Sequence, residues 1–303
     1  MKIELGKYYV LYNPYAGNGR GRKDSEALKT LMKNDDLEFC DITKIISYKD
    51  FFSKVAKDEA VIISGGDGTL NRFINNTDSL DIENDILYFA TGSGNDFLND
   101  LNKKKGEKPF SIKKYIKHLP EVTVNGQKSK FLNGIGYGID GYCCEIGDKK
   151  RNQSGKPINY TTIALKGLFI GYNPTNAIIT VDGKRYIYNH VWLVPTMNGR
   201  FFGGGMMATP NQDRLNSDHV VSVAVMSCKS RFKTLMAFPS IFKGEHITKH
   251  KDLINIFTGH KIMVEFDRPT ALQIDGETIK NVSRYSVSSS SSKVSKEKEF
   301  ETI

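Results

Sequence analysis

One stretch constrains the fold of the 303-residue chain more than any other, AVIISGGDGTLNRFIN at residues 60–75. A short apolar run, typical of a buried strand, leads into a glycine-rich turn, and apolar residues at helical spacing follow it. The same order of strand, polar loop and helix recurs through the first third of the chain. Such alternation predicts a parallel sheet with helices on both faces.

The loops that follow the strands in this first third share a composition. Strands are expected at 8–13, 39–45, 60–64 and 86–90, and helices from about Asp24, over 48–57, and from 69 and 92 onward. Two further loops, NPYAGNGRGR (13–22) and TGSGNDF (91–97), again combine glycines with small polar residues. Ligands on open parallel sheets bind at the carboxyl ends of the strands, so these loops are expected to cluster around one ligand.

The texture of the chain changes after about Glu121. Short runs rich in Val, Ile, Tyr and Phe recur to residue 289, and Asn125-Gly126 and Asp182-Gly183 are hairpin signals. This half predicts a β-sandwich or barrel with one or two inserted helices, one of them in NYTTIALKGLF (159–169). The expected division is therefore an α/β domain over 1–121 and an all-β domain over 122–303.

The composition is that of an ordinary globular protein, with 39% hydrophobic and 25% charged residues. The net charge of +9 suits nucleic acid, an anionic membrane surface or a phosphate-rich ligand, and does not choose among them. Four cysteines without CxxC spacing are typical of reduced thiols in a cytosolic protein. No signal segment and no apolar run of ~18 residues is found. A cytoplasmic protein is expected, one that can still visit a membrane surface.

The glycine-rich turn at 65–69 predicts a phosphate site. Glycines let backbone N–H groups converge, and the N-terminus of the following helix favours an anion. Thr69 adds a hydroxyl donor. Asp67 would repel a phosphate unless a cation lies between them, and Mg²⁺ suits that role because it binds few carboxylates together with phosphates and water. A plain glycine turn that caps a helix is the alternative for this loop taken alone.

Two patterns in the β-rich half also place carboxylates beside glycines. NGIGYGID ends at Asp140, and LQIDGE puts Asp275 and Glu277 two residues apart, on one face of an extended segment. Asp275-Gly276 is by itself more typical of a hairpin turn than of a functional site. In FFGGGMMATP (201–210), a strand bulge with core methionines is the corresponding alternative.

Taken together and in order, NPYAG, SGGDGTLN, GSGNDF, NGIGYGID, GGGMMATP and DGE resemble the diacylglycerol kinase catalytic family, and more narrowly its soluble bacterial lipid kinases, relatives of sphingosine and ceramide kinases. The resemblance covers roughly residues 7 to 290. It implies an N-terminal α/β domain of the phosphofructokinase type and a C-terminal β-sandwich, with the active site in the cleft between them.

The resemblance also implies roles for particular residues. Asp275 corresponds to the general base of bacterial members, with Glu277 beside it, whereas the sphingosine kinase branch gives the base role to the position of Asp67; both assignments stay open. Three carboxylates would organise Mg²⁺ through water molecules, namely Asp67, Asp96 and Asp140. The residues expected to hold ATP are Asn13, Gly17, Gly65, Gly66, Asp67, Gly68, Thr69, Gly92, Ser93 and Asn95.

The chain departs from the family pattern at a few positions. Arg72 stands where the family commonly has Glu, Ser93 replaces the usual Thr, and Asn76 and Ala90 replace Gly and Pro. After Pro210, Asp218 is followed by His219 rather than Gly, which leaves the roles of Asp213 and Asp218 open.

The function that follows is an ATP- and Mg²⁺-dependent lipid kinase, with diacylglycerol as the expected acceptor and phosphatidic acid as the product. An NAD kinase-type enzyme and a non-catalytic nucleotide- or lipid-binding regulator are the alternatives. Peripheral binding to an anionic membrane is expected, with basic patches at 103–105 and 149–151 and a stripe at 111–119 as candidates; packing onto the core is the preferred interpretation of that stripe. A homodimer is left open, and no nucleic-acid partner is expected.

Overall fold

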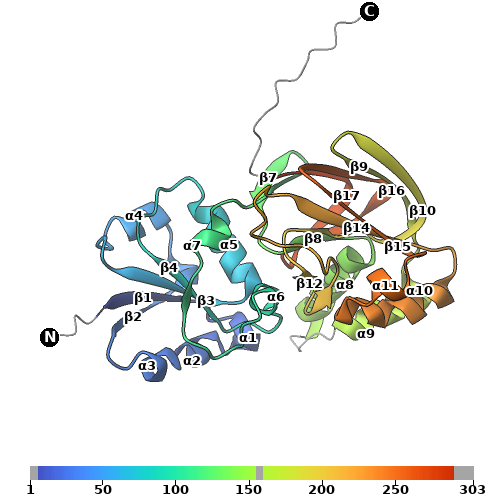
Figure 1. Ribbon diagram of the computed structural model, residues 1–303. Helices are drawn as coiled ribbons and strands as arrows, with labels where there is room; N and C mark the ends of the chain where they lie inside the picture. Colours follow the sequence, from blue (N-terminus) through green and yellow to red (C-terminus); the bar gives the residue numbers. More distant parts are fainter. Residues whose placement is uncertain (1–5, 155–159, 290–303) are drawn as a thin grey trace, which may run out of the picture.

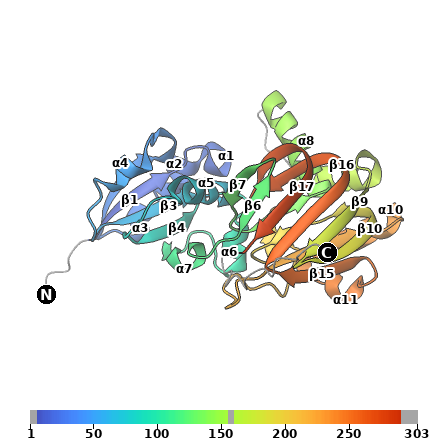
Figure 2. The same cartoon turned by 90° about the horizontal axis from the view of Figure 1, so that it is seen from above.

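The computed structural model describes residues 6–154 and 160–289. Two domains lie side by side, an N-terminal α/β domain and a C-terminal β-rich domain (Figures 1 and 2). The predicted combination of a parallel sheet followed by a β-rich half is therefore confirmed. Whether the C-terminal tail returns to the first domain concerns residues outside those described.

The first domain is built, within the described residues, on a sheet with the order β2-β1-β3-β4-β5. The first four strands run parallel, and β5 pairs antiparallel with β4. Because β1, β3 and β4 are neighbours, the loops that follow them meet at one edge of the sheet. The strands are β1 (Lys7–Tyr12), β2 (Asp36–Asp41), β3 (Ala60–Gly65), β4 (Ile86–Ala90) and β5 (Phe110–Ser111).

Helices cover both faces of this sheet, as expected. The side chains of β1, β3 and β4 divide between two apolar clusters, one containing Phe73 and Phe97 and the other Leu28. The predicted strand at 39–45 ends early, at Asp41, because the Asp41 side chain accepts a hydrogen bond from the Thr43 amide and opens a 3₁₀ turn. The helical elements are α1 (Ala16–Gly19), α2 (Gly21–Ser25), α3 (Leu28–Leu31), η1 (Ile42–Lys44), α4 (Tyr48–Phe52), α5 (Asp67–Thr77), α6 (Asp96–Asp100) and α7 (Lys113–Ile116).

The second domain is one continuous hydrogen-bonded sheet that closes on itself, because β9 pairs with both β10 and β16. A large apolar cluster that includes Tyr137 and Tyr285 fills the space that the sheet encloses. The predicted hairpins at Asn125-Gly126 and Asp182-Gly183 are confirmed. The strands are β6 (Glu121–Val124), β7 (Gln127–Lys130), β8 (Gly134–Tyr137), β9 (Thr175–Val181), β10 (Lys184–Leu193), β11 (Thr196–Met197), β14 (Val221–Ser227), β15 (Ile254–Gly259), β16 (Lys261–Ile274) and β17 (Glu277–Ser288).

Helices pack on the outside of this sheet around a second apolar cluster that contains Trp192. The helix expected in 159–169 is present and continues into a π-helical turn. A longer helix, α8, was not predicted. The elements are α8 (Ile139–Ser154), α9 (Tyr160–Lys166), η2 (Gly167–Gly171), α10 (Arg231–Ala237), η3 (Phe238–Lys243) and α11 (His246–Lys249), with a small separate hairpin of β12 (Phe201–Phe202) and β13 (Met206–Met207).

The structure bears on the predicted membrane-facing stripe and on the predicted boundary between the domains. In the stripe at 111–119, Ile112 and Leu119 are buried, so the preferred interpretation, packing onto the core, is confirmed. No helix in the described part of the chain is long and apolar enough to cross a membrane. Since β6 begins at Glu121 and pairs with β17, we keep the division of the domains near residue 121 as a proposal.

Candidate active site

The loop after β3 and the loop after β4 are in direct contact through glycines. A Cβ atom on Gly92 would lie 2.4 Å from the Cα atom of Gly66, so a side chain there would push the two loops apart. The Asn13 amide, in the loop after β1, donates to the Thr69 hydroxyl over 2.8 Å. The structure thus brings together the three loops that were expected to share a ligand.

The other expected nucleotide residues line the same edge of the sheet. Gly17 has a φ of +58°, and a Cβ there would come within 2.7 Å of the Thr91 carbonyl oxygen. Asn95 is buried and donates to the Gly92 carbonyl over 3.0 Å. Ser93, by contrast, is exposed at the start of its loop. The residues proposed to hold ATP therefore lie on adjoining loops.

Lys105 adds a positive charge to these loops that sequence reasoning had assigned to a membrane-facing patch. Its ammonium group donates to the Thr91 and Gly92 carbonyls over 3.3 and 3.4 Å. It also lies 3.3 Å from a carboxylate oxygen of Asp24. No local pattern in KKKGEK indicates this position, because all three partners lie in earlier parts of the chain.

Asp67 joins the glycine loop to the start of α6. One oxygen accepts a hydrogen bond from the Asp96 amide over 2.6 Å, and the other a longer one of 3.4 Å from the Phe97 amide. Burial, and then the nearby charge of Asp96, raise the pKa of Asp67 to about 7. The carboxyl group can therefore gain or lose a proton near neutral pH.

Asp96 and Asp140 are buried carboxylates at the junction of the domains. Asp96 accepts from the Gly204 amide over 2.9 Å, which ties α6 to the β12–β13 hairpin. Burial raises the pKa of each to about 6, and the Gln273 amide partly offsets that effect at Asp140. Gly136 leaves room for Asp140, because a Cβ there would lie 1.6 Å from a carboxylate oxygen.

These carboxylates bear on whether the site suits Mg²⁺. One oxygen of Asp96 and one of Asp140 are buried and have no hydrogen-bond partner among the described residues. Those residues also hold no group of three or more Asp, Glu, His or Cys side chains close enough to bind a metal ion together. The two unpartnered oxygens are acceptors that the water molecules around a bound Mg²⁺ could use, so the residues present fit a hydrated ion.

Asp275 is both a hairpin-turn residue and a buried carboxylate. It has a φ of +45° in the tight turn between β16 and β17. Its oxygens accept hydrogen bonds from the Asn71 amide and from three successive backbone amides, over 2.5–3.1 Å, at Leu132, Asn133 and Gly134. Burial raises the pKa of Asp275, and the hydrogen bonds oppose that effect.

Glu277 follows the turn and forms an ion pair across the domain junction. Its carboxylate lies 2.5 Å from the guanidinium of Arg72 on α5, and both side chains are exposed. Arg72 is the residue that departs from the family's usual Glu. Arg72 thus supplies a positively charged partner to Glu277 beside the glycine loop.

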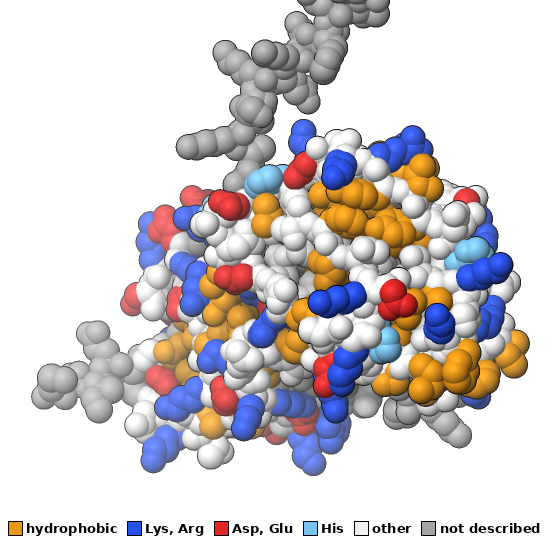
Figure 3. All heavy atoms as spheres, turned by 45° about the vertical axis from the view of Figure 1, so that its right-hand side comes forward, with side chains coloured by type: hydrophobic (Ala, Val, Ile, Leu, Met, Phe, Trp, Pro, Cys, Tyr) orange, Lys and Arg blue, Asp and Glu red, His pale blue; other side chains and the backbone are white. Residues whose placement is uncertain are grey.

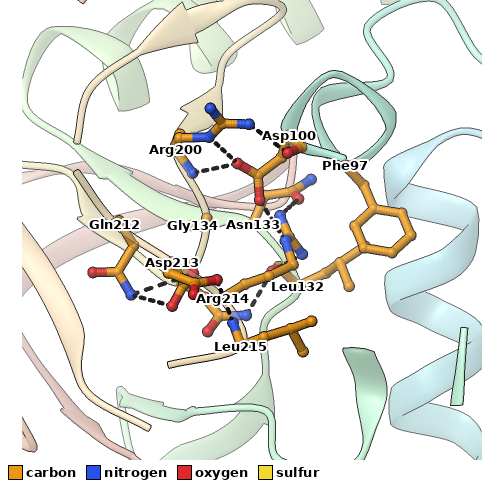
Figure 4. Close-up of polar contacts among 12 residues, drawn as sticks. Phe97, Asp100, Leu132, Asn133, Gly134, Arg200, Gln212, Asp213, Arg214 and Leu215 are labelled. Atoms are coloured by element: carbon orange, nitrogen blue, oxygen red, sulfur yellow. Dashed lines mark hydrogen bonds and ion pairs between the residues drawn. The ribbon is translucent and has the colours of Figure 1, made fainter. Parts of the chain in front are cut away.

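A further junction, which sequence reasoning missed, centres on Asp100 at the end of α6 (Figure 4). Its carboxylate accepts hydrogen bonds from the side chains of Arg200 and Arg214, and Arg214 is itself buried. Arg214 also donates to the Leu132 carbonyl and lies over the Phe97 ring, 4.7 Å from its centroid. Burial disfavours the ionised form, but the two arginines outweigh it and lower the pKa of Asp100.

The segment after Pro210 contains Arg214 and both carboxylates whose roles were left open, Asp213 and Asp218. Asp213 accepts a hydrogen bond from the Leu215 amide over 2.9 Å, which makes it a turn residue (Figure 4). His219 has a φ of +55°, a conformation usual for the Gly that the family carries there.

Comparison with known proteins places this arrangement in a family. Residues 7–126 match the diacylglycerol kinase catalytic domain, and residues 133–289 match the YegS C-terminal NAD kinase beta sandwich-like domain. The diacylglycerol kinase of Mycobacterium tuberculosis is 25% identical over 255 residues, which cover 80% of this chain and 81% of that relative. YtlR of Bacillus subtilis, provisionally named a lipid kinase, is 25% identical over 295 residues, which cover 87% and 93%.

A solved structure shares the fold. A crystal structure from Bacillus anthracis, provisionally named a diacylglycerol kinase, has a TM-score of 0.64 and 21% sequence identity, and the match covers 95% of this chain and 93% of that one. The two family models together span most of both domains, and their order along the chain is the order of the domains. The protein therefore belongs to the diacylglycerol kinase family of lipid kinases.

Proposed function

We propose that the protein transfers the γ-phosphate of ATP, with Mg²⁺, to the hydroxyl group of a membrane lipid, and that the lipid is diacylglycerol and the product phosphatidic acid. One observation carries the proposal. Three glycine-containing loops of the first domain lie next to buried carboxylates that come from both domains. The Mycobacterium tuberculosis relative, which is named a diacylglycerol kinase, supports the choice of acceptor.

The nucleotide is assigned to the loops of the first domain. Backbone amides of Gly65 to Thr69, at the start of α5, favour the phosphates of ATP. Asn13, Gly17, Gly92, Ser93 and Asn95 would complete this binding surface, and the Lys105 ammonium lies beside it. Phosphoryl transfer asks the protein mainly to fix the reacting groups in line and to balance negative charge.

Asp67, Asp96 and Asp140 would hold Mg²⁺ through water molecules. When bound, the ion neutralises charge that develops on the phosphates. Their carboxylates come from three different elements, so the ion's water shell would be fixed only when both domains are in place. The two unpartnered buried oxygens support this assignment.

Asp275 is proposed as the general base and Glu277 as the group beside it. The lipid hydroxyl gives its proton to the Asp275 carboxylate, its oxygen bonds to the γ-phosphorus, and the bond from that phosphorus to the ADP oxygen breaks. Three of the four donors to Asp275 are backbone amides, whereas Asn71 is a side chain. Asn71 is therefore the donor that a substrate hydroxyl could displace.

Asp67 is a second candidate for the base, because its pKa of about 7 suits proton transfer at neutral pH. The two assignments separate in a pH profile of kcat/KM. If Asp67 is the base, kcat/KM falls on the acidic side of about pH 7, and this acidic limb of the profile is absent in Asp67→Asn. If Asp275 is the base, Asp275→Asn lowers turnover by ~10²–10⁴-fold while Asp67→Asn leaves a titrating limb.

The decisive experiment incubates the purified protein with γ-labelled ATP, Mg²⁺ and mixed micelles that hold diacylglycerol, sphingosine, ceramide or phosphatidylglycerol, with NAD in a parallel tube. Labelled phosphatidic acid that disappears in Asp275→Asn supports the proposal. A labelled product from another lipid would correct the acceptor, and label in NADP would move the protein to the NAD kinase type. ATP binding without any product would indicate a regulator.

A further inference from the structure

Two neighbouring segments on the outside of the C-terminal domain carry apolar side chains that point away from the protein. On α9 and η2, Phe169 and Ile170 are 64% and 85% exposed, and Leu165 beside them is also exposed. On α10, Phe232 and Met236 are 71% and 63% exposed. We call these five residues the apolar patch. Hydrophobic side chains gather at the lower right of the molecule, over this part of the domain (Figure 3).

The apolar patch is not a consequence of loose packing, because the same helices bury a different set of residues. Ile163, Ala164 and Leu168 on the first segment, and Ala237 on the second, belong to the buried cluster around Trp192. A helix that is apolar on its inner and its outer face is normally covered on both. Contiguous exposed apolar surface of this kind indicates an interaction site.

The two segments are held rigidly together. The Arg231 guanidinium donates to the Leu168 carbonyl over 3.0 Å and to the Asn173 side chain over 2.9 Å, and it lies over the Trp192 ring. The segment of α9 and η2 also packs on α8, which carries Asp140 at its first turn. The apolar patch is therefore a fixed surface connected to the candidate site.

The charges around the apolar patch identify its partner. Residues 160–173 and 228–244 contain no Asp or Glu, but they contain several cations, namely Lys166, Lys229, Arg231, Lys233 and Lys243. The lysines are exposed. Exposed apolar side chains on segments whose own charged residues are all cations fit the boundary between the acyl chains and the anionic headgroups of a bilayer.

We infer that the apolar patch is the surface by which this protein docks on an anionic membrane, with Phe169, Ile170 and Phe232 in the acyl boundary and Lys166 and Lys233 against the headgroups. The inference rests on the proposed function in one respect, since a lipid kinase has to reach an acceptor that stays in the bilayer. It replaces the basic patches and the stripe that the sequence had offered as membrane contacts.

The test measures binding to vesicles in the absence of ATP, so that it does not depend on activity. Sedimentation is compared for vesicles of phosphatidylcholine alone and of equal parts phosphatidylcholine and phosphatidylglycerol. Combining Phe169→Ser with Phe232→Ser is expected to weaken binding by about tenfold or more, since burying even part of each ring contributes strongly. Lys166→Gln with Lys233→Gln should weaken binding only to the anionic vesicles and remove part of its salt dependence.

The matched control combines Ile46→Ser with Ile187→Ser, because both isoleucines are exposed, 102% and 70%, outside the apolar patch. This variant should bind like wild type, and all variants should phosphorylate a short-chain, water-soluble diacylglycerol equally. Unchanged binding of the phenylalanine variant, or equal weakening of the control, overturns the inference. The inference is also overturned if the wild type is a dimer in solution and the phenylalanine variant is a monomer, because the apolar patch then binds a second copy of the chain. A wild type that binds vesicles but phosphorylates nothing would sink the proposed function alone.

Discussion

Asp275 shows that a residue in a confirmed hairpin turn can also be a buried carboxylate at the candidate site. The Asp-Gly dipeptide makes the hairpin turn that its sequence predicts, and the turn directs the carboxylate inward onto three backbone amides. The left-handed backbone of this position suits Asp, whose side chain is short and polar. The confirmed turn is therefore compatible with the proposed role of Asp275 as a general base.

Asn71 should tune the basicity of Asp275. Its amide donates to the Asp275 carboxylate over 2.7 Å and thereby lowers the pKa of that group. We expect Asn71→Leu to raise this pKa, so that the acidic limb of the kcat/KM profile moves to higher pH. The measurement is a pH series with the proposed lipid substrate.

Asn75 provides the control for this variant. It contacts the same Lys130 backbone as Asn71 and donates to the backbone and side-chain oxygens of Asn71 over 3.0 and 3.2 Å, but it is not a donor to Asp275. Asn75→Leu loses these contacts and keeps the Asn71 amide that donates to Asp275, so the acidic limb should stay where it is. A limb that stays fixed in Asn71→Leu as well would show that Asp275 does not titrate in catalysis.

The contact between the two glycine loops gives a second prediction at the scale of single residues. Gly92→Ala places a methyl group against the Gly66 backbone, so it should displace both loops and abolish ATP binding. Gly94→Ala is matched to it, because a Cβ there meets its nearest neighbour at 3.7 Å. Fluorescent ATP-analogue titration should find nearly normal affinity for Gly94→Ala, and equal affinities would refute the close-contact argument.

Among the elements, the short helix α6 joins the two domains from both of its ends. Its first turn contacts the β12–β13 hairpin through Asp96, and its last residue, Asp100, meets two arginines of the second domain. Arg214→Leu removes one partner of a buried ion pair, and we expect it to lower the free energy of unfolding by ~3–5 kcal/mol. Urea denaturation followed by circular dichroism measures this.

A double-mutant cycle separates the pairing from the loss of packing. Asp100→Asn combined with Arg214→Leu should cost less than the sum of the single variants, because it leaves no unpaired buried charge. Arg214→Lys keeps the positive charge but not the planar contacts of the guanidinium, so its free energy of unfolding should lie between those of wild type and Arg214→Leu. Strict additivity would mean that the two side chains do not stabilise each other.

At the scale of elements, the sequence predicts strands and loops better than it predicts which side chains pair across the fold. The glycine loops and the Asp-Gly turns could be predicted because backbone geometry selects those residues locally. The pairing of Arg214 with Asp100 could not, since the two lie 114 residues apart. Helix α8 was missed because glycines precede it and its later residues are mostly polar, which hides the helical period.

Across the whole molecule, two buried carboxylates, Asp96 and Asp140, and the partly buried Asp67 make stability depend on pH. The pKa values of Asp67, Asp96 and Asp140 are raised to about 7, 6 and 6, whereas an unfolded chain releases these protons near pH ~4. Between these values the folded state binds more protons than the unfolded one, so its stability falls as the pH rises. In EDTA, the contribution of these groups to the Tm should therefore decline from about pH 4 to pH 7.

Asp140→Asn tests whether the free energy of unfolding falls as the pH rises. The variant should melt a few degrees above wild type at pH 8 and close to it at pH 4, because only ionisation makes Asp140 unfavourable. Replacing EDTA with Mg²⁺ should raise the Tm of wild type at pH 8 more than that of the variant. A variant that melts below wild type at pH 8 in EDTA would contradict the raised pKa.

The contacts of Asp275 also set an order of events during synthesis. Its partners Asn71 and Leu132 leave the ribosome 204 and 143 residues before it does, and the last hairpin closes the sheet. The α/β domain can fold while the rest of the chain is still being made. The set of residues proposed for catalysis, however, forms only once β16 and β17 have emerged. A nascent or prematurely terminated chain thus carries the proposed nucleotide loops without the carboxylate proposed as their general base.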